Sequence, residues 1–149
     1  MCELLSDSII GFVSGCLSSV FVSIFSKIYW DKAEHKKQFK MDKQTYSRYI
    51  QNINLELLLA CKSGDTEHLV RTIEDEPFRE TFKNLSDESI VKVKEIKNYI
   101  EKLKEKALNE EISDKNYKVL HGELYRYSVW ALTLTEESSK RKGKRIGGF

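Results

Sequence analysis

The feature that most constrains this chain is the uncharged, largely apolar segment Ser8–Ser26 near its N-terminus. At about 1.5 Å per residue, a helix of this length nearly spans the roughly 30 Å hydrocarbon core of a bilayer. Lys27 can extend its charged end toward water, which lets Tyr29 and Trp30 occupy the interface where aromatic side chains are enriched. The sequence therefore predicts a single transmembrane helix within residues 1–30.

Three alternatives explain this segment less well. A buried core helix is one, but a domain of this size rarely contains so long a helix without a charge. A cleaved signal peptide needs a positive start and a small-residue cleavage site, whereas the chain begins MCELLSD and has no A-x-A site. Residues 13–16 fit a bacterial lipoprotein cleavage box, but few apolar residues precede Cys16 and the apolar segment continues beyond it.

The distribution of cations predicts an orientation. No Lys or Arg precedes the segment, and six lysines follow within about 17 residues, inside the window that governs the positive-inside rule. They are Lys27, Lys32, Lys36, Lys37, Lys40 and Lys43. The N-terminus is therefore expected outside and the remainder in the cytoplasm, in a plasma membrane or a bacterial inner membrane.

Small residues gather on one half of the predicted transmembrane helix. Gly11 and Gly15 form a GxxxG motif that Ser19 and Ser23 continue at steps of four. Such residues allow two helix backbones to approach closely. The predicted packing face consists of Gly11, Ser14, Gly15, Ser18, Ser19 and Ser23. Two alternatives stay open: the general abundance of Gly and Ser in membrane helices, and a face that lines water in a ring of helices.

The rest of the chain predicts helices. With 1 Pro and 7 Gly in 149 residues, the sequence disfavours a turn-rich β-sandwich and a glycine-rich nucleotide-binding fold. Apolar residues recur at steps of three and four in three long stretches. The expected buried stripes are Phe39, Tyr46, Ile50, Ile53, Leu57 and Ala60; Val93, Ile96, Ile100, Leu103 and Ala107; and Tyr117, Leu120, Leu124, Tyr127, Ala131 and Leu134.

Caps and turn residues divide these stretches. Gly64 is expected to end the first helix, and Asp65 or Thr66 to begin a short one. The third helix is expected to start at Ser86 or Asp87, and the last at Ser113 or Asp114. The predicted fold is all-α: an N-terminal segment and transmembrane helix (1–30), a small cytoplasmic antiparallel helical bundle (31–139) and a basic flexible tail (140–149).

The basic tail admits two interpretations. Its cations are Lys140, Arg141, Lys142, Lys144 and Arg145. They form either a disordered, solubilising end or a polybasic segment held on anionic lipid or nucleic acid. Lipid is the nearer partner for a tethered chain, and a net charge of +2 predicts no specific nucleic-acid partner.

No motif predicts catalysis or a cofactor. The cysteines (2, 16 and 61) and histidines (35, 68 and 121) lack metal-ligand spacing, and no phosphate-binding loop or nucleophile elbow is present. The acidic cluster Glu74–Glu76 with Glu80 is expected to be a solvated helix end. Tyr125, Tyr127 and Trp130 are expected to pack in a core. The chain is thus predicted to have no enzymatic activity, metal or cofactor.

Two functional hypotheses remain. The first is a single-pass membrane protein that anchors or assembles a complex through its transmembrane helix and its bundle. Its partners would be lipids and either its own copies or another membrane protein. The second is a small oligomeric effector that forms a pore or disrupts the bilayer when triggered. The absence of charges between Asp7 and Lys27 disfavours a permanently wet pore.

Overall fold

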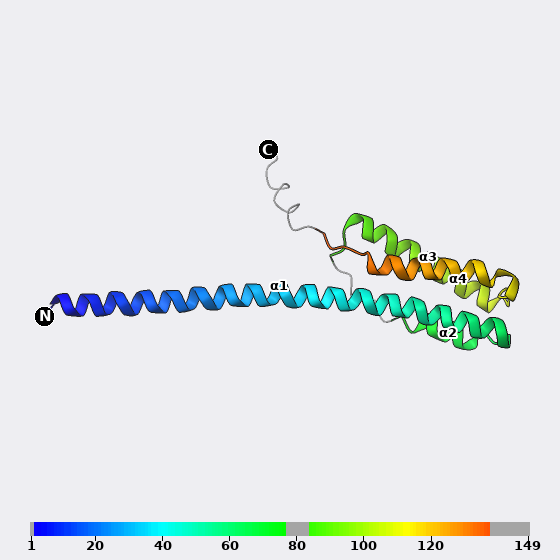
Figure 1. Cartoon of the computed structure of the whole chain (residues 1–149), viewed down its shortest axis with the longest axis horizontal. Helices are drawn as coiled ribbons and strands as arrows, with labels where there is room; N and C mark the ends of the chain where they lie inside the picture. Colours follow the sequence, from blue (N-terminus) through cyan, green and yellow to red (C-terminus); the bar gives the residue numbers. More distant parts are fainter. Residues whose placement is uncertain (1, 77–83, 138–149) are drawn as a thin grey trace, which may run out of the picture. The chain divides into compact units, whose positions relative to one another are not determined.

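The computed structural model describes the backbone of residues 2–76 and 84–137, and within these ranges the side chains from Ser19 onward. The described residues form four helices and no extended strand (Figure 1). The chain divides into two compact units, Met1–Lys40 and Met41–Phe149. The all-α class predicted from the sequence is confirmed. The division at residue 30, which marks an expected membrane boundary, stays a prediction.

Helix α1 runs without a break from Cys2 to Ser63. No Gly or Pro interrupts the sequence between Gly15 and Gly64, so the helix continues past Asp31, where a break was the alternative. Gly64 ends it as predicted: its φ is +74°, and its N–H donates to the Ala60 carbonyl at 2.9 Å. Glycine adopts this left-handed conformation without the steric cost that other residues meet.

Helix α2 (Glu67–Glu74) returns along the end of α1. The Asp65 carboxylate accepts the Glu67 N–H at 2.9 Å and so supports the first turn, whereas the Thr66 hydroxyl donates to the Ala107 carbonyl of α3 at 3.1 Å. The Tyr49 hydroxyl of α1 donates to the Ile73 carbonyl at 2.7 Å. Both ends of this short helix are therefore tied to the longer helices.

Helices α3 (Asp87–Leu108) and α4 (Asp114–Leu132) form an antiparallel pair. The Ser86 side chain caps α3 by accepting the Ser89 N–H at 3.3 Å. At the start of α4, the Asn116 amide oxygen accepts the Ser113 N–H at 3.0 Å. Both predicted N-caps are confirmed, and consecutive helices alternate in direction, as expected for an antiparallel bundle.

The three predicted stripes form the core. All of their residues are buried except Phe39, Val93 and Tyr117, which are half-buried at the ends of their stripes. Tyr49, Leu69, Ile73 and Leu85 complete the core of the described residues. Hydrogen bonds join α1 to α4 and to the segment after it: the side chains of Asn54 and His121 are 2.9 Å apart, and Lys43 Nζ donates to the Leu134 carbonyl at 3.1 Å.

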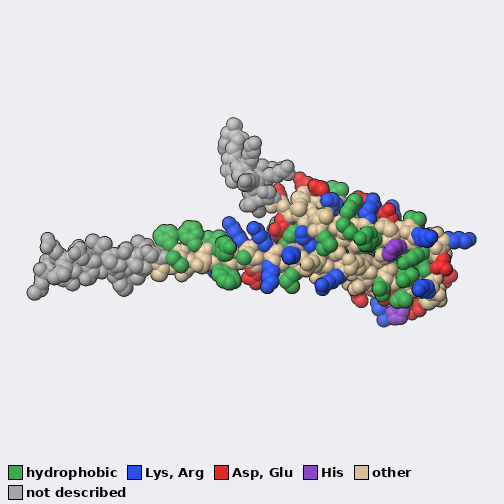
Figure 2. Space-filling view, viewed as in Figure 1, with side chains coloured by type: hydrophobic (Ala, Val, Ile, Leu, Met, Phe, Trp, Pro, Cys, Tyr) green, Lys and Arg blue, Asp and Glu red, His purple; other side chains and the backbone are tan. Residues whose placement is uncertain are grey.

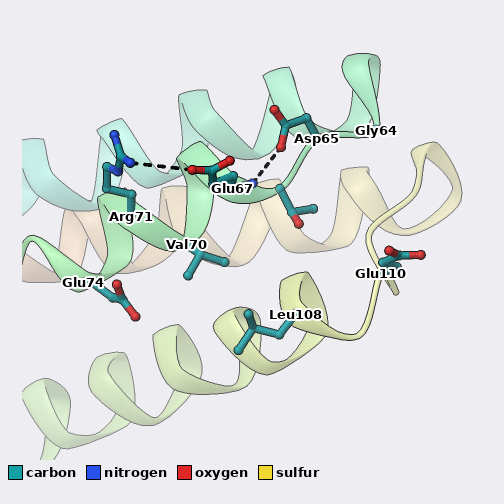
Figure 3. Close-up of a pocket in the computed structure, with 9 residues that line it drawn as sticks. Gly64, Asp65, Glu67, Val70, Arg71, Glu74, Leu108 and Glu110 are labelled. Carbon is teal, nitrogen blue, oxygen red and sulfur yellow. Dashed lines mark hydrogen bonds and ion pairs between the residues drawn. The ribbon is translucent and has the colours of Figure 1, made fainter.

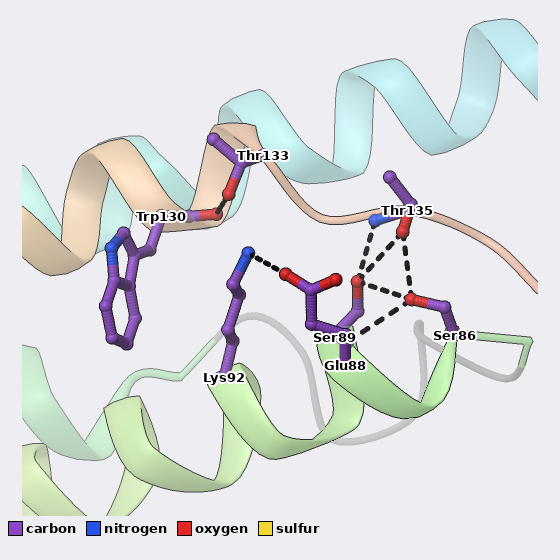
Figure 4. A network of polar contacts seen from close by, with 7 residues as sticks. All are labelled: Ser86, Glu88, Ser89, Lys92, Trp130, Thr133 and Thr135. Atoms are coloured by element: carbon purple, nitrogen blue, oxygen red, sulfur yellow. Dashed lines mark hydrogen bonds and ion pairs between the residues drawn. The ribbon is translucent and has the colours of Figure 1, made fainter.

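A cluster of hydroxyl groups joins the segment after α4 to the start of α3 (Figure 4). The buried Ser89 Oγ accepts the Thr135 N–H at 2.8 Å and lies 3.0 Å from Ser86 Oγ. The Ser86 N–H donates to the Thr135 carbonyl at 2.9 Å, beside an antiparallel bridge between Leu85 and Glu136. We call Ser86, Ser89 and Thr135 the hydroxyl clamp. It fixes the open end of the α3–α4 pair.

Candidate interaction surfaces

The structure describes the side chains of only part of the predicted packing face of the N-terminal helix. Its first four residues belong to the part of α1 whose side chains are not described: Gly11, Ser14, Gly15 and Ser18. Ser19 and Ser23 are exposed on α1. The contact predicted for this face stays a prediction. The cations of the basic tail, Lys140, Arg141, Lys142, Lys144 and Arg145, lie outside the described residues.

Large apolar side chains are exposed along the next three turns of α1. In the space-filling view they form the apolar group beside the undescribed end of the helix (Figure 2). They are Val20, Phe21, Val22, Ile24, Phe25, Ile28, Tyr29 and Trp30, with exposed fractions between 47% and 75%. We call them the α1 apolar segment. At 3.6 residues per turn they point in most directions around the helix.

No helix among the described residues combines enough length with enough apolar character to cross a membrane.

A second exposed apolar surface lies on α4, opposite its buried stripe. Tyr125 is 63% exposed, Val129 43% and Leu132 46%. Their spacing of four and three residues places them on one face of the helix. We call these three residues the α4 outer stripe. The prediction that Tyr125 packs in the core is wrong, whereas Tyr127 is buried as expected.

Tyr127 belongs to an aromatic and charged cluster between α3 and α4. Its ring lies 5.0 Å from that of Tyr99 and 5.5 Å from that of Trp130, measured between centroids. The Arg126 guanidinium carbon lies 4.9 Å from the centroids of both Tyr127 and Trp130. Arg126 also pairs with Glu123. The hydroxyl groups of Tyr99 and Tyr127 and the Arg126 guanidinium all meet partners within the bundle, so packing explains the cluster best.

An open pocket of about 530 Å³ lies where α2 meets the end of α3 (Figure 3). Its lining comprises Gly64, Asp65, Thr66, Glu67, Val70, Arg71, Glu74, Leu108 and Glu110. Arg71 pairs with Glu67 at 3.6 Å, and Glu74 pairs with Lys104 at 2.9 Å. The lining carries the carboxylates of Asp65, Glu67, Glu74 and Glu110, and two of them, Glu67 and Glu74, form these ion pairs.

The acidic cluster at the end of α2 is more than the solvated helix end that the sequence predicts. Glu74 pairs with Lys104, and Glu76 pairs with Lys97 at 3.1 Å. These pairs connect α2 and the residues after it to α3. Glu80 lies outside the described residues. Within the described ranges, no three His, Cys, Asp or Glu residues are grouped as a metal site would require.

Cys61 is a free thiol on the half-buried side of α1. Burial raises its pKa, and the charge of Asp114 adds to that shift. A raised pKa leaves less of the reactive thiolate at neutral pH, so Cys61 is a poor nucleophile.

Sequence reasoning missed the α4 outer stripe, although its helical spacing was visible. It also missed the hydroxyl clamp, which has no local signature. Comparison of the chain with protein-family models, curated protein sequences and solved structures finds no match.

Proposed function

We propose that this chain is a non-enzymatic, single-pass membrane protein that anchors or assembles a complex through its N-terminal helix and its helical bundle. The observation that carries the proposal is the α1 apolar segment, whose side chains are exposed all along Val20–Trp30. Exposed apolar surface of this extent marks a binding or membrane surface. Removing each large side chain from water contributes about 1.5–3 kcal/mol.

The directions in which these side chains point favour lipid over a protein partner as what contacts them. A single partner helix or a shallow groove covers one side of a helix, whereas a bilayer covers all sides. Between Val20 and Tyr29, only the side that carries Ser19 and Ser23 lacks large apolar groups, and Trp30 lies on that side at the end of the segment. The uncharged sequence Ser8–Ser26 would place these residues within the hydrocarbon core, and Tyr29 and Trp30 at its edge.

Assembly would use two surfaces that are neither in contact with lipid nor buried in the bundle core. The small-residue face from Gly11 to Ser23 would pack against a membrane helix of a second copy or of another membrane protein. The α4 outer stripe would supply an apolar contact to the same partner outside the membrane. The lysines after Trp30 favour an orientation with the bundle in the cytoplasm.

Membrane integration is tested by extracting cell membranes with alkaline carbonate. The wild-type chain should stay in the membrane, and the variant Leu17→Arg/Phe21→Arg should be released because two charges in the hydrocarbon core are costly. The matched control Leu55→Arg/Val119→Arg carries the same charge change on exposed bundle residues and should stay. Release of the wild-type chain would contradict the proposal.

Orientation is tested with a reporter that is active only outside the cytoplasm, fused after Phe149. It should be inactive, because the cation-rich side is retained in the cytoplasm. Strong activity would reverse the proposed topology.

Assembly is tested by comparing Gly15→Ile with Leu17→Ile in the full chain. The first substitution places a branched side chain where close backbone contact is proposed, so self-association or partner recovery should fall. The second lies on the opposite side and should have little effect. Equal effects at the two positions would contradict a one-sided packing face.

A further inference from the structure

A row of lysines lies on one face of α1 directly after the α1 apolar segment. Because the helix is unbroken through this region, Lys32, Lys36 and Lys40 occupy successive turns. At 3.6 residues per turn, they fall within about 80° of arc. All three are exposed, and none of them forms an ion pair within the described part of the chain. We call these three residues the lysine row.

The acidic residues of the same segment lie on the other side of the helix. At 3.6 residues per turn, Asp31 and Glu34 lie roughly 140–160° from the centre of the lysine row. The opposite charges are therefore separated around α1, and the lysine row presents an uncompensated positive face. Figure 2 shows Lys and Arg side chains, in blue, on the helix next to the green apolar group.

The lysine row continues a line of apolar residues. Phe25 and Tyr29 lie on the same side of α1 as Lys32 and Lys36, at the expected steps of four and three. One face thus changes from apolar to cationic over about two turns. An apolar stretch followed by a cationic one matches a lipid, whose acyl chain is apolar and whose headgroup carries the phosphate.

The distances along the helix also suit a headgroup. At 1.5 Å per residue, Lys32 lies about 3 Å beyond Trp30, Lys36 about 9 Å and Lys40 about 15 Å. Helical side chains lean toward the N-terminus, which here is toward the aromatic pair. Lys32 and Lys36 can therefore reach phosphates at the interface, while Lys40 adds attraction over the Debye length of about 8–10 Å.

We infer that the lysine row is a binding site for the phosphate of an anionic phospholipid, with Phe25 and Tyr29 contacting its acyl chain. The inference rests on the proposed membrane insertion and names the lipid class that surrounds α1 on its cytoplasmic side. A nucleic acid would pair with the lysines but would leave Phe25 and Tyr29 uncovered. Lipid accounts for both halves of the face.

The experiment measures which lipid lies beside Trp30. The full chain, carrying Trp130→Phe so that Trp30 is its one tryptophan, is reconstituted in phosphatidylcholine vesicles that contain one fifth phosphatidylglycerol. Bromine on the acyl chains of one lipid at a time quenches Trp30 where that lipid is adjacent. Phosphatidylglycerol should be preferred by about fivefold or more, since each lysine near the surface contributes about 1 kcal/mol. High salt should reduce the preference.

Two variants locate the effect. Lys32→Gln/Lys36→Gln/Lys40→Gln should abolish the preference. The charge-matched control Lys94→Gln/Lys102→Gln/Lys118→Gln changes exposed lysines of the bundle and should retain it. Inorganic phosphate should compete no better than chloride at equal ionic strength, because it lacks the acyl chain. Equal loss in both variants, or displacement by inorganic phosphate, would overturn the inference.

The outcomes separate this inference from the proposed function. Equal quenching by both brominated lipids overturns the lipid preference but leaves membrane insertion intact. Absence of quenching by either lipid, together with release by carbonate, contradicts membrane insertion itself. Binding of a labelled oligonucleotide that is lost in the lysine-row variant, without lipid preference, assigns the face to nucleic acid and overturns the inference.

Discussion

At the scale of single residues, the end of α3 holds an unfavourable backbone conformation. Glu110 has a φ of 55°, and the residue after it donates its N–H to the Lys106 carbonyl at 2.9 Å. This is the arrangement in which glycine is normally found after a helix. A side chain in the left-handed region costs about 1–2 kcal/mol.

Glu110→Gly is therefore expected to stabilise the bundle. The gain should be about 0.5–1 kcal/mol. The backbone strain that the substitution relieves in the folded state is larger than the entropic stabilisation that glycine gives to the unfolded chain. The free energy of unfolding can be measured from Trp130 fluorescence in denaturant, with the full chain carrying Trp30→Phe in mild detergent. Gly64→Ala is the opposite control: Gly64 has a φ of +74°, so this substitution should destabilise the bundle by about 1 kcal/mol. A loss of stability in Glu110→Gly would contradict the assignment of strain.

Tyr99 predicts how the bundle responds to alkaline pH. Its hydroxyl lies 3.4 Å from the Leu120 carbonyl, and burial raises its pKa to about 12, with smaller contributions from Glu123 and Tyr127. In the unfolded chain the pKa is about 10. Between these values the folded state keeps the proton that the unfolded state has lost. The free energy of unfolding should therefore fall as pH rises from about 10 to 12.

Tyr99→Phe should make this fall less steep. It should not remove it, because burial also raises the pKa values of Tyr46 and Tyr49. Denaturant unfolding at a series of alkaline pH values measures the slope. Tyr125→Phe, at an exposed position, is the matched control and should leave the slope unchanged. Identical slopes for wild type and Tyr99→Phe would show that Tyr99 does not contribute.

At the scale of elements, the hydroxyl clamp determines how the α3–α4 pair closes. Ser89 is 2% exposed, and its side-chain oxygen is the acceptor for the Thr135 N–H. Removing that oxygen leaves a backbone donor without its partner. Thr135 is exposed and the bond is part-buried, so its loss costs about 0.5–1.5 kcal/mol, the net contribution of a typical hydrogen bond.

Ser89→Ala is accordingly expected to destabilise the bundle by about 0.5–1.5 kcal/mol. Thr133→Ala is the control: Thr133 is exposed, and its hydroxyl bonds to the nearby Trp130 carbonyl at 2.8 Å. Its effect should stay within about 0.5 kcal/mol. Hydrogen exchange should also quicken at the Thr135 amide in Ser89→Ala. An unchanged exchange rate would show that the clamp does not protect this amide.

At the scale of the whole molecule, an anchor and a pore make opposite demands on the serine side of α1. A pore needs Ser19 and Ser23 to meet water, whereas an anchor needs them against another helix. No charged residue between Asp7 and Lys27 would hold water in a lumen. The reconstituted chain, without any trigger, should therefore leave vesicles impermeable to small ions.

Vesicle leakage and cysteine labelling together test this expectation. Cys16 should resist water-soluble thiol reagents in intact vesicles, and Cys61 in the unfolded chain serves as the labelling control. Spontaneous ion leakage with rapid labelling of Cys16 would favour the pore. A tight vesicle with unlabelled Cys16 would favour the anchor in the untriggered state.

Local patterns in the sequence determined the helices and much of the core. Helix α1 ends before Gly64, and α3 begins after Ser86, because backbone conformation and capping depend on neighbouring residues. Apolar residues at steps of three and four identified buried stripes because the helical repeat fixes which side chains share a face. The lysines and acidic residues that alternate after Trp30 are also a local pattern in the sequence. The lysine row shares one face, however, only because α1 continues unbroken through it.

The tertiary structure alone decided which side chains meet across the bundle. Ser89 and Thr135 are 46 positions apart in the sequence, and Lys43 and Leu134 are 91 apart. No local periodicity encodes such contacts, because they depend on the relative placement of whole helices. The same reason explains Glu74 and Glu76: the sequence shows an acidic helix end, and only the packing of α2 on α3 brings Lys104 and Lys97 to it.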